Sequence, residues 1–258
     1  MRLPIRTIRK VHRYLGLIIG IQLLLWTGSG LFFSLNPIEK VRGEHLMAPP
    51  PVLSPDDTLL ASPAQVLQEL QQRFPEAEVL QITLRPLLDR PVYEVTLREN
   101  EALRFALADA RTGKLRPPIT ETEAIAIAKA DFIPEAPVAA IEYLTEAPRG
   151  SEFRNSPLPV YRVVFDHPTG TRIYVAAANG RVTARRNDTW RWFDFFWMFH
   201  IMDYRDRDNF NHLLLQGFSL FGLLTVLSGF VLWAVTSPTL RGRRKRVRRR
   251  ASAASPQA

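Results

Sequence analysis

Few residues in this chain are able to bind a metal or a metal-containing cofactor. There is no cysteine, which excludes thiolate zinc sites, iron–sulfur clusters, disulfides and haem attached through C-x-x-C-H. Metal chemistry therefore depends on carboxylates and on five histidines, at positions 12, 45, 167, 200 and 212. No H-E-x-x-H, G-x-S-x-G, Walker or dinucleotide-binding motif is present. The motifs thus leave open whether the protein is an enzyme.

Two of the histidines and one acidic cluster are expected to be solvated. His45 falls in a proline-rich linker and His167 at a hairpin tip. Asp203, Asp206 and Asp208 resemble a calcium-binding ladder, but the glycine and terminal glutamate of an EF-hand are missing, and two arginines alternate with them. We therefore expect a solvated loop there.

The remaining histidines lie beside two long apolar blocks. Residues 14–35 and 213–235 carry no charge, and each block has about the 20 residues needed to cross ~30 Å of hydrocarbon. The first is too long for a signal-peptide core and has no A-x-A-like site after it, so we expect it to remain uncleaved. His12 precedes the first block, His212 precedes the second, and His200 lies twelve residues earlier.

The positive charge is concentrated in the two tails. Five basic residues precede the first block, eight occur in residues 241–250, and these tails contain no acid. The formal net charge of +9 therefore comes from the tails. The positive-inside rule predicts that both termini are cytoplasmic and that the intervening residues are extracytoplasmic. A basic tail can bind anionic lipid or nucleic acid. We favour a topology anchor in contact with lipid and expect no nucleic-acid partner.

The region between the blocks contains an internal repeat. Residues 91–95 (PVYEV) match 159–163 (PVYRV), and 104–108 (RFALA) match 172–176 (RIYVA). Each copy then reaches a turn with a glycine, Gly113 or Gly180, at an offset of 67–68 residues. Glycine supplies the positive φ that a tight hairpin turn needs. Each copy is predicted to contain about three antiparallel strands.

A helix is predicted before each set of strands. Ser62 followed by Pro63 is a helix start, and Thr120 with Glu123 forms a capping box. The predicted fold is α+β, with two transmembrane helices flanking a duplicated helix-plus-antiparallel-sheet domain. The boundaries are a basic N-terminus at 1–13, a first span at 14–35, a linker at 36–61, repeats at 62–118 and 119–189, an aromatic interfacial segment at 190–212, a second span at 213–235 and a basic tail at 236–258.

The order of these motifs resembles a known family. A helix followed by PVYEV and DARTGKL (109–115) is similar to a PepSY domain, present here in two copies. The flanking segments VHRYLGL (11–17), FHIMD (199–203) and LSGFVLW (227–233) are similar to the PepSY-associated transmembrane family. Larger members with four spans are membrane haem proteins of bacterial iron uptake, which reduce ferric siderophores on the outer side. Soluble PepSY modules act as inhibitory or chaperone-like domains of secreted peptidases.

The resemblance implies haem b and draws attention to His12, His200 and His212 as ligands. Because about 20 helical residues span ~30 Å, His12 and His212 cannot share one iron. Two spans also cannot enclose a porphyrin, whereas a homodimer or a partner membrane protein would complete a four-helix bundle. In a homodimer, paired His12 residues would bind an inner haem, and paired His200 or His212 an outer one. Each histidine is equally consistent with an interfacial anchor.

Two functions remain open from the sequence. The first is an inner-membrane haem-b electron-transfer component that reduces a periplasmic metal complex, such as a ferric siderophore, or a redox partner. The second is a non-enzymatic, membrane-tethered PepSY module that binds or inhibits an extracytoplasmic protein such as a peptidase. The missing second pair of spans favours the tethered module, and histidines at both membrane faces favour electron transfer.

Overall fold

The computed structural model describes residues 5–53 and 59–238. The predicted basic tail lies outside the described residues from position 239 onward, and so does part of the predicted linker. Among the described residues the chain forms two units, treated separately below: a helix unit (residues 5–35 and 195–238) and a sheet unit (residues 36–194). The predicted α+β class, with two long apolar helices flanking two antiparallel sheets, is confirmed.

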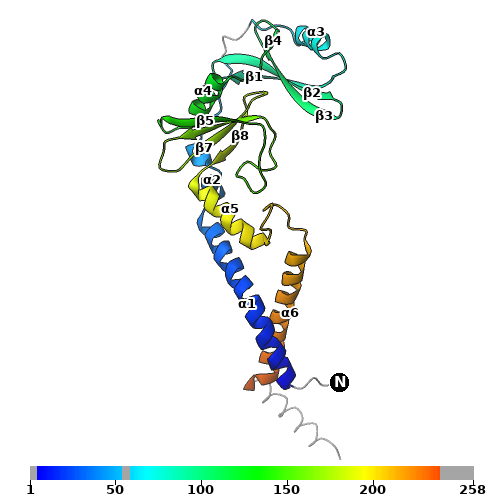
Figure 1. Cartoon of the computed structure of the whole chain (residues 1–258), viewed down its shortest axis with the longest axis vertical. Helices are drawn as coiled ribbons and strands as arrows, with labels where there is room; N and C mark the ends of the chain where they lie inside the picture. The colour runs from blue at the N-terminus through cyan, green and yellow to red at the C-terminus, as the bar shows by residue number, and fades with distance from the viewer. Residues whose placement is uncertain (1–4, 54–58, 239–258) are drawn as a thin grey trace, which may run out of the picture. The chain divides into compact units, whose positions relative to one another are not determined.

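The helix unit is built on two antiparallel helices, α1 (Ile5–Leu35) and α6 (Leu213–Thr236). Both are long and apolar enough to cross a bilayer. They approach each other at the N-terminal part of α1 and diverge toward its other end, where the C-terminal part of α5 (Asp188–Ile201) contacts α1 (Figure 1).

The sheet unit contains two four-stranded antiparallel sheets, each with its strands in sequential order. After a short helix α2 (Ile38–Val41) and the 3-10 turn η1 (Glu44–Leu46), the first repeat has helix α3 (Pro63–Arg73) and strands β1 (Glu78–Leu87), β2 (Arg90–Glu99), β3 (Ala102–Asp109) and β4 (Leu115–Arg116). The second repeat has helix α4 (Glu121–Asp131) and strands β5 (Val138–Leu144), β6 (Val160–Phe165), β7 (Arg172–Ala176) and β8 (Val182–Arg186).

The predicted helix starts are present. The Ser62 hydroxyl accepts the Ala64 N–H at the start of α3. Thr120 and Glu123 form a reciprocal capping box at the start of α4. These caps satisfy backbone donors that the first helical turn leaves unpaired, so each helix begins where the sequence indicates.

Helix α4 joins the two repeats into one core. One buried cluster contains residues of the first sheet, of α4 and of the second sheet (Leu87, Val92, Leu107, Ala124, Ile127, Phe132, Val163 and Ile173 among them). Helix α3 packs on the other face of the first sheet, where Val66 and Leu70 are buried with Tyr93, Val95 and Leu97. Figure 1 shows α4 between the two sheets. The shared core explains the duplication, since one such unit alone is small for a stable core.

The strand pairing shows how many residues separate equivalent positions in the two repeats. Tyr93 of β2 pairs with Ala108, and its counterpart Tyr161 of β6 pairs with Val175. Strand β6 is therefore offset by 68 residues from β2, whereas β7 is offset by 67 from β3, so the predicted match of 104–108 with 172–176 is out by one residue. One residue fewer in the second hairpin accounts for the difference, and a one-residue shift of register would move each side chain to the opposite face.

Each sheet has one strand more than predicted, β1 in the first and β5 in the second. Both strands carry a register irregularity, at Val79/Gln81 and at Val138/Ala140. A bulge interrupts the alternation of apolar and polar residues by which a strand is recognised. In the second repeat the segment 145–159 also covers the face of the sheet opposite α4, with Phe153 stacked on Tyr174 at 4.4 Å between ring centroids.

Candidate functional site

Polar residues line the contacts that α1 makes with α5 and α6. Gln22 and Ser29 of α1 and Thr225 of α6 are each at most 7% exposed, beside the apolar Ile19. In the α1–α6 contact, a Cβ atom added to Gly222 would lie 3.9 Å from Ile19 and Trp26, an ordinary contact distance. Polar side chains within apolar spans are costly unless they are hydrogen-bonded and turned inward, so the contacts of α1 with α5 and α6 have a specific polar arrangement.

His12 is held by a serine of the facing helix. Its Nδ1 lies 2.7 Å from the Ser228 hydroxyl oxygen. That hydroxyl donates its one proton to the Thr225 carbonyl, at 2.7 Å. With the hydroxyl proton on the Thr225 carbonyl, the serine oxygen accepts from His12 and Nδ1 carries the donated proton. In the neutral imidazole this leaves Nε2 with a free lone pair, the form in which histidine binds a metal.

The neighbour of Ser228 leaves room for this imidazole. A Cβ atom added to Gly229 would lie 3.4 Å from His12 Cε1, a contact tighter than most side chains make. Glycine at this position therefore lets the imidazole edge lie directly against the α6 backbone.

His200 of α5 has the same arrangement with a serine of α1. Its Nδ1 lies 2.8 Å from the Ser29 hydroxyl, and Ser29 donates to the Leu25 carbonyl at 2.7 Å. The ring lies parallel to Trp197 and edge-on to Phe33. Burial lowers the pKa of His200, which favours the neutral imidazole. With the Ser29 proton on the backbone, His200 also has Nδ1 protonated and Nε2 free.

His212 has both ring nitrogens engaged in the fold. Its Nδ1 accepts the Leu215 N–H as the N-cap of α6, at 3.3 Å. Its Nε2 lies 3.0 Å from the Ile201 carbonyl, to which it donates. The histidine thus joins the start of α6 to the end of α5, with no lone pair left for a ligand.

Two side chains of α1 bond to the carbonyls next to Ile201. Gln22 donates to the Phe199 carbonyl at 3.1 Å, and the Trp26 indole donates to the His200 carbonyl at 2.7 Å. The last carbonyls of a helix have no partner within it. Side-chain donors therefore fix the end of α5, and with it His200, against α1.

The two serine-bound histidines lie at different levels of the helix unit. Ser29, which binds His200, is 17 positions after His12, or about 25 Å along α1. One iron therefore cannot bind both imidazoles of one chain. Among residues 5–53 and 59–238, no three histidine, aspartate or glutamate side chains come together as a metal site.

Comparison with known proteins assigns the chain to a family. The family model described as the PepSY-associated TM region matches residues 9–254. The chain belongs to the PepSY-associated transmembrane family. This membership, together with two candidate spans, makes it a membrane protein. No curated protein and no solved structure matches it.

Sequence reasoning selected the histidines of this PepSY-associated protein but missed the residues that orient them. The bonds of Ser29 to His200 and of Ser228 to His12 were not predicted, nor were those of Gln22 and Trp26 to the end of α5. The available signal was a set of polar residues within otherwise apolar spans, which usually face a partner helix. The sequence alone does not say which histidine each serine contacts.

Proposed function

We propose that this PepSY-associated protein is a haem-b electron-transfer component of the membrane, which reduces a metal complex or redox partner on the extracytoplasmic side. One observation carries the proposal. Two histidines, His12 and His200, are each bonded through Nδ1 to a serine whose own proton is committed to the helix backbone. In most metal-binding histidines, the ring nitrogen that does not bind the metal donates a hydrogen bond in this way, which orients the ring and leaves the other nitrogen free.

The donor chemistry of these residues fits a b-type haem. Neutral imidazole is a common axial ligand of haem iron, and haem bound there would supply one-electron transfer. Each chain offers one such imidazole at each level among its described residues, so a haem with two histidine ligands requires a second chain, either another copy or a partner membrane protein. A homodimer would supply the matching His12 and His200 and complete a four-helix bundle, the usual place for such cofactors.

Two levels separated by about 25 Å along α1 are also suited to crossing a bilayer of ~30 Å. His12 follows basic residues at the predicted cytoplasmic end, and His200 is near the opposite end of α1. We propose that the His12 level lies toward the source of electrons and the His200 level toward the acceptor, with a ferric complex as the acceptor class.

The test is a reduced-minus-oxidised visible spectrum of the detergent-purified full chain, expressed with ample haem. We expect a b-type signal, reduced by about half in His12→Ala and in His200→Ala and absent in the double variant. His45→Ala is the matched control, because His45 is exposed in η1 of the sheet unit. A colourless wild-type protein, or a signal that the double variant retains, would refute the proposal.

A second candidate function is favoured by one surface. Leu103 and Phe105 lie on the same face of β3 and are 62% and 39% exposed. In the second sheet, segment 145–159 covers the face opposite its helix, whereas this pair remains open. A membrane-tethered module that binds an extracytoplasmic protein would use such a face. A colourless protein with a co-purifying partner lost in Phe105→Ser would support this function.

A further inference from the structure

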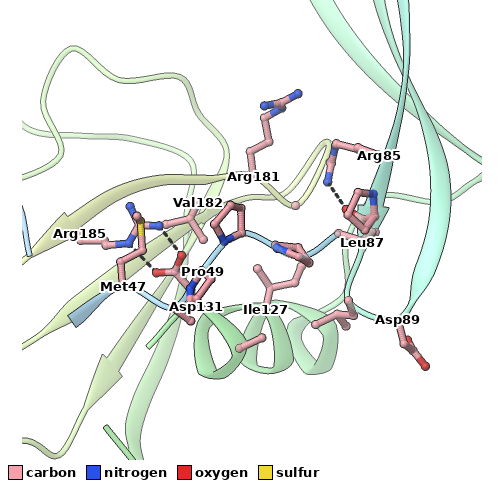
Figure 2. Close-up of a pocket in the computed structure, with 17 residues that line it drawn as sticks. Met47, Pro49, Arg85, Leu87, Asp89, Ile127, Asp131, Arg181, Val182 and Arg185 are labelled. Atoms are coloured by element: carbon pink, nitrogen blue, oxygen red, sulfur yellow. Dashed lines mark hydrogen bonds and ion pairs between the residues drawn. The ribbon is translucent and has the colours of Figure 1, made fainter. Parts of the chain in front are cut away.

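A cavity of about 720 Å³ lies within the sheet unit, where the two repeats meet (Figure 2). The proline segment 49–51, Leu87 and Leu88 at the end of β1, Ile127 of α4 and Val182 of β8 form its apolar walls. Sites for small molecules are mostly apolar clefts of roughly 300–1,000 Å³ with a few polar groups that fix orientation. This cavity has the size and the walls of such a site.

One polar group at the cavity is a pair of arginines that share a single carboxylate. Glu94 is buried, with 5% of its surface exposed. It accepts from Arg85 Nε at 2.6 Å and, through both oxygens, from Arg181 Nε at 2.9 Å. Because one carboxylate faces two guanidinium groups, this cluster has a net charge of +1.

The two arginines differ in the donors that they have left. Arg85 also donates to the Pro86 carbonyl at 3.2 Å and to the Asn179 carbonyl, so each of its nitrogens has a partner. Arg181 uses only Nε; within the described part of the chain its two terminal nitrogens bond to no residue, and its side chain is 53% exposed. These terminal nitrogens form the fork that binds a carboxylate in bidentate fashion.

The turn before Arg181 fixes its place. Gly180 has φ +73°, and a Cβ atom there would approach side-chain atoms of Leu87, Ile119 and Ile127 to 2.9–3.1 Å. Only glycine accommodates both the backbone conformation and this close approach. The β7–β8 turn therefore sits directly against the first repeat, which places Arg181 beside the end of β1.

The other charges at the cavity do not compete for an anion. Asp131 and Arg185 form a bidentate pair that is neutral overall. Figure 2 shows this pair near Met47, at the opposite end of the cavity from Asp89. Asp89 is exposed. The guanidinium donors that remain free at the cavity, within the described residues, are thus those of Arg181.

We propose that this cavity binds a small organic carboxylate with an apolar body, the carboxylate on the Arg181 fork and the apolar body against Leu87, Ile127 and Val182. The carboxylate belongs either to a free organic acid or to the C-terminus of a short apolar peptide. This binding activity goes beyond the proposed function and does not depend on haem.

The test measures binding to the full chain in lipid nanodiscs by ligand-detected ¹⁹F NMR. The probes are 4-(4-fluorophenyl)butyrate for a free acid and a fluorophenylalanine-ended dipeptide for a peptide C-terminus, each compared with its neutral amide. We expect at least one acid to bind about tenfold more tightly than its amide, because charge-assisted hydrogen bonds are lost in the amide. The acid that binds identifies the source of the carboxylate.

Two variants separate the charge from the walls. Arg181→Gln should weaken binding of the acid about tenfold and leave the amide unchanged, while Glu94 keeps Arg85 as its partner. Ala130→Phe, on the exposed surface of α4 that borders the cavity, should fill the space and abolish binding of both forms. Arg98→Gln is the control, because Arg98 is an exposed arginine of the same sheet that, among the described residues, forms an ion pair only with Glu78 at the surface.

Three results would overturn the proposal. Neither acid binds; or acid and amide bind equally; or Arg181→Gln binds the acid as well as Arg98→Gln does. The thermal unfolding midpoint of each variant, which we expect to equal that of the wild type, shows that a loss of binding is not a loss of fold.

Discussion

At the residue scale, Ser29 accepts from His200 and Ser228 accepts from His12, because each serine hydroxyl donates its own proton to a backbone carbonyl. Ser29→Ala and Ser228→Ala should therefore leave Nδ1 of the facing imidazole without its partner and free the ring to rotate. We expect haem retention at the affected level to fall about tenfold, as is typical when the second partner of a ligating histidine is removed. The haem-to-protein ratio after dialysis measures it.

Ser34→Ala is the matched control for this prediction. Ser34 is an exposed serine of α1, and within the described part of the chain its hydroxyl bonds only to the Leu31 carbonyl of its own turn. Equal haem loss in all three variants would show that the serines act on helix stability instead of on the histidines.

Asp203 organises the loop between α5 and α6. Desolvation alone would raise the pKa of its carboxyl, but the backbone N–H groups of Asn209, Asp206, Asp208 and Arg205 donate to it and lower the pKa to about 2 from an ordinary value of 3.8. Because the folded pKa is depressed, the carboxylate stabilises the loop at pH above about 4. This stabilisation is lost as the pH falls toward 2.

Asp203→Asn should therefore open this loop at neutral pH, since an amide offers one acceptor oxygen where the carboxylate offers two. We expect faster trypsin cleavage after Arg205 and Arg207, by a few-fold, in limited proteolysis of the purified protein. The Asn211→Ala variant, changed at an exposed residue of the same loop, should be cleaved at the wild-type rate. Equal cleavage of both variants would contradict an organising carboxylate.

The sequence shows which histidines lie beside the apolar blocks, but it does not show what each histidine contacts. His12 and Ser228 are 216 positions apart, and Ser29 and His200 are 171 apart. No local pattern encodes such contacts, because they depend on which faces of α1, α5 and α6 meet. His212, equivalent to the others by position in the sequence, differs from them only through its bonds to Leu215 and Ile201.

At the element scale, the α1–α6 contact depends on glycines in unequal ways. A Cβ atom at Gly229 meets His12 at 3.4 Å, whereas one at Gly217 meets nothing within 4 Å. Gly217→Ala should stabilise α6 by about 0.5–1 kcal/mol, because alanine loses less conformational entropy in a helix. Gly229→Ala should displace the His12 imidazole, and the cost of this displacement should offset the stabilisation of the helix. The two unfolding midpoints in nanodiscs, with the visible spectrum of each variant, measure the difference, and identical behaviour would contradict close packing at His12.

The elements of the sheet unit show which sequence signals are reliable. Caps at Ser62 and Thr120 and the repeated PVY segments predicted α3, α4, β2 and β6 correctly, because each is a local backbone requirement. Strands β1 and β5 were missed where bulges break the alternation. The role of α4 in a core shared by both sheets was also not predictable from the pattern of either repeat alone.

At the scale of the whole molecule, the charge distribution predicts that both termini are cytoplasmic and the sheet unit extracytoplasmic. The absence of cysteine provides a clean background for labelling. Gln71→Cys, on the exposed surface of α3, should react with a membrane-impermeant maleimide in spheroplasts. Thr7→Cys, at the exposed start of α1, should react only after lysis. The reverse pattern would contradict the proposed orientation.

The proposed activity also belongs to the whole molecule, because one chain offers a single free imidazole at each level and the proposal takes the second from another copy. The measurement that tests this most directly is electron paramagnetic resonance of the oxidised, haem-replete protein. Two imidazoles on one ferric iron give a low-spin signal. We predict that signal in the wild type at one haem per chain, halved in His12→Ala and in His200→Ala and absent in the double variant. A high-spin signal, or a low-spin signal that survives the double variant, would contradict ligation by His12 and His200.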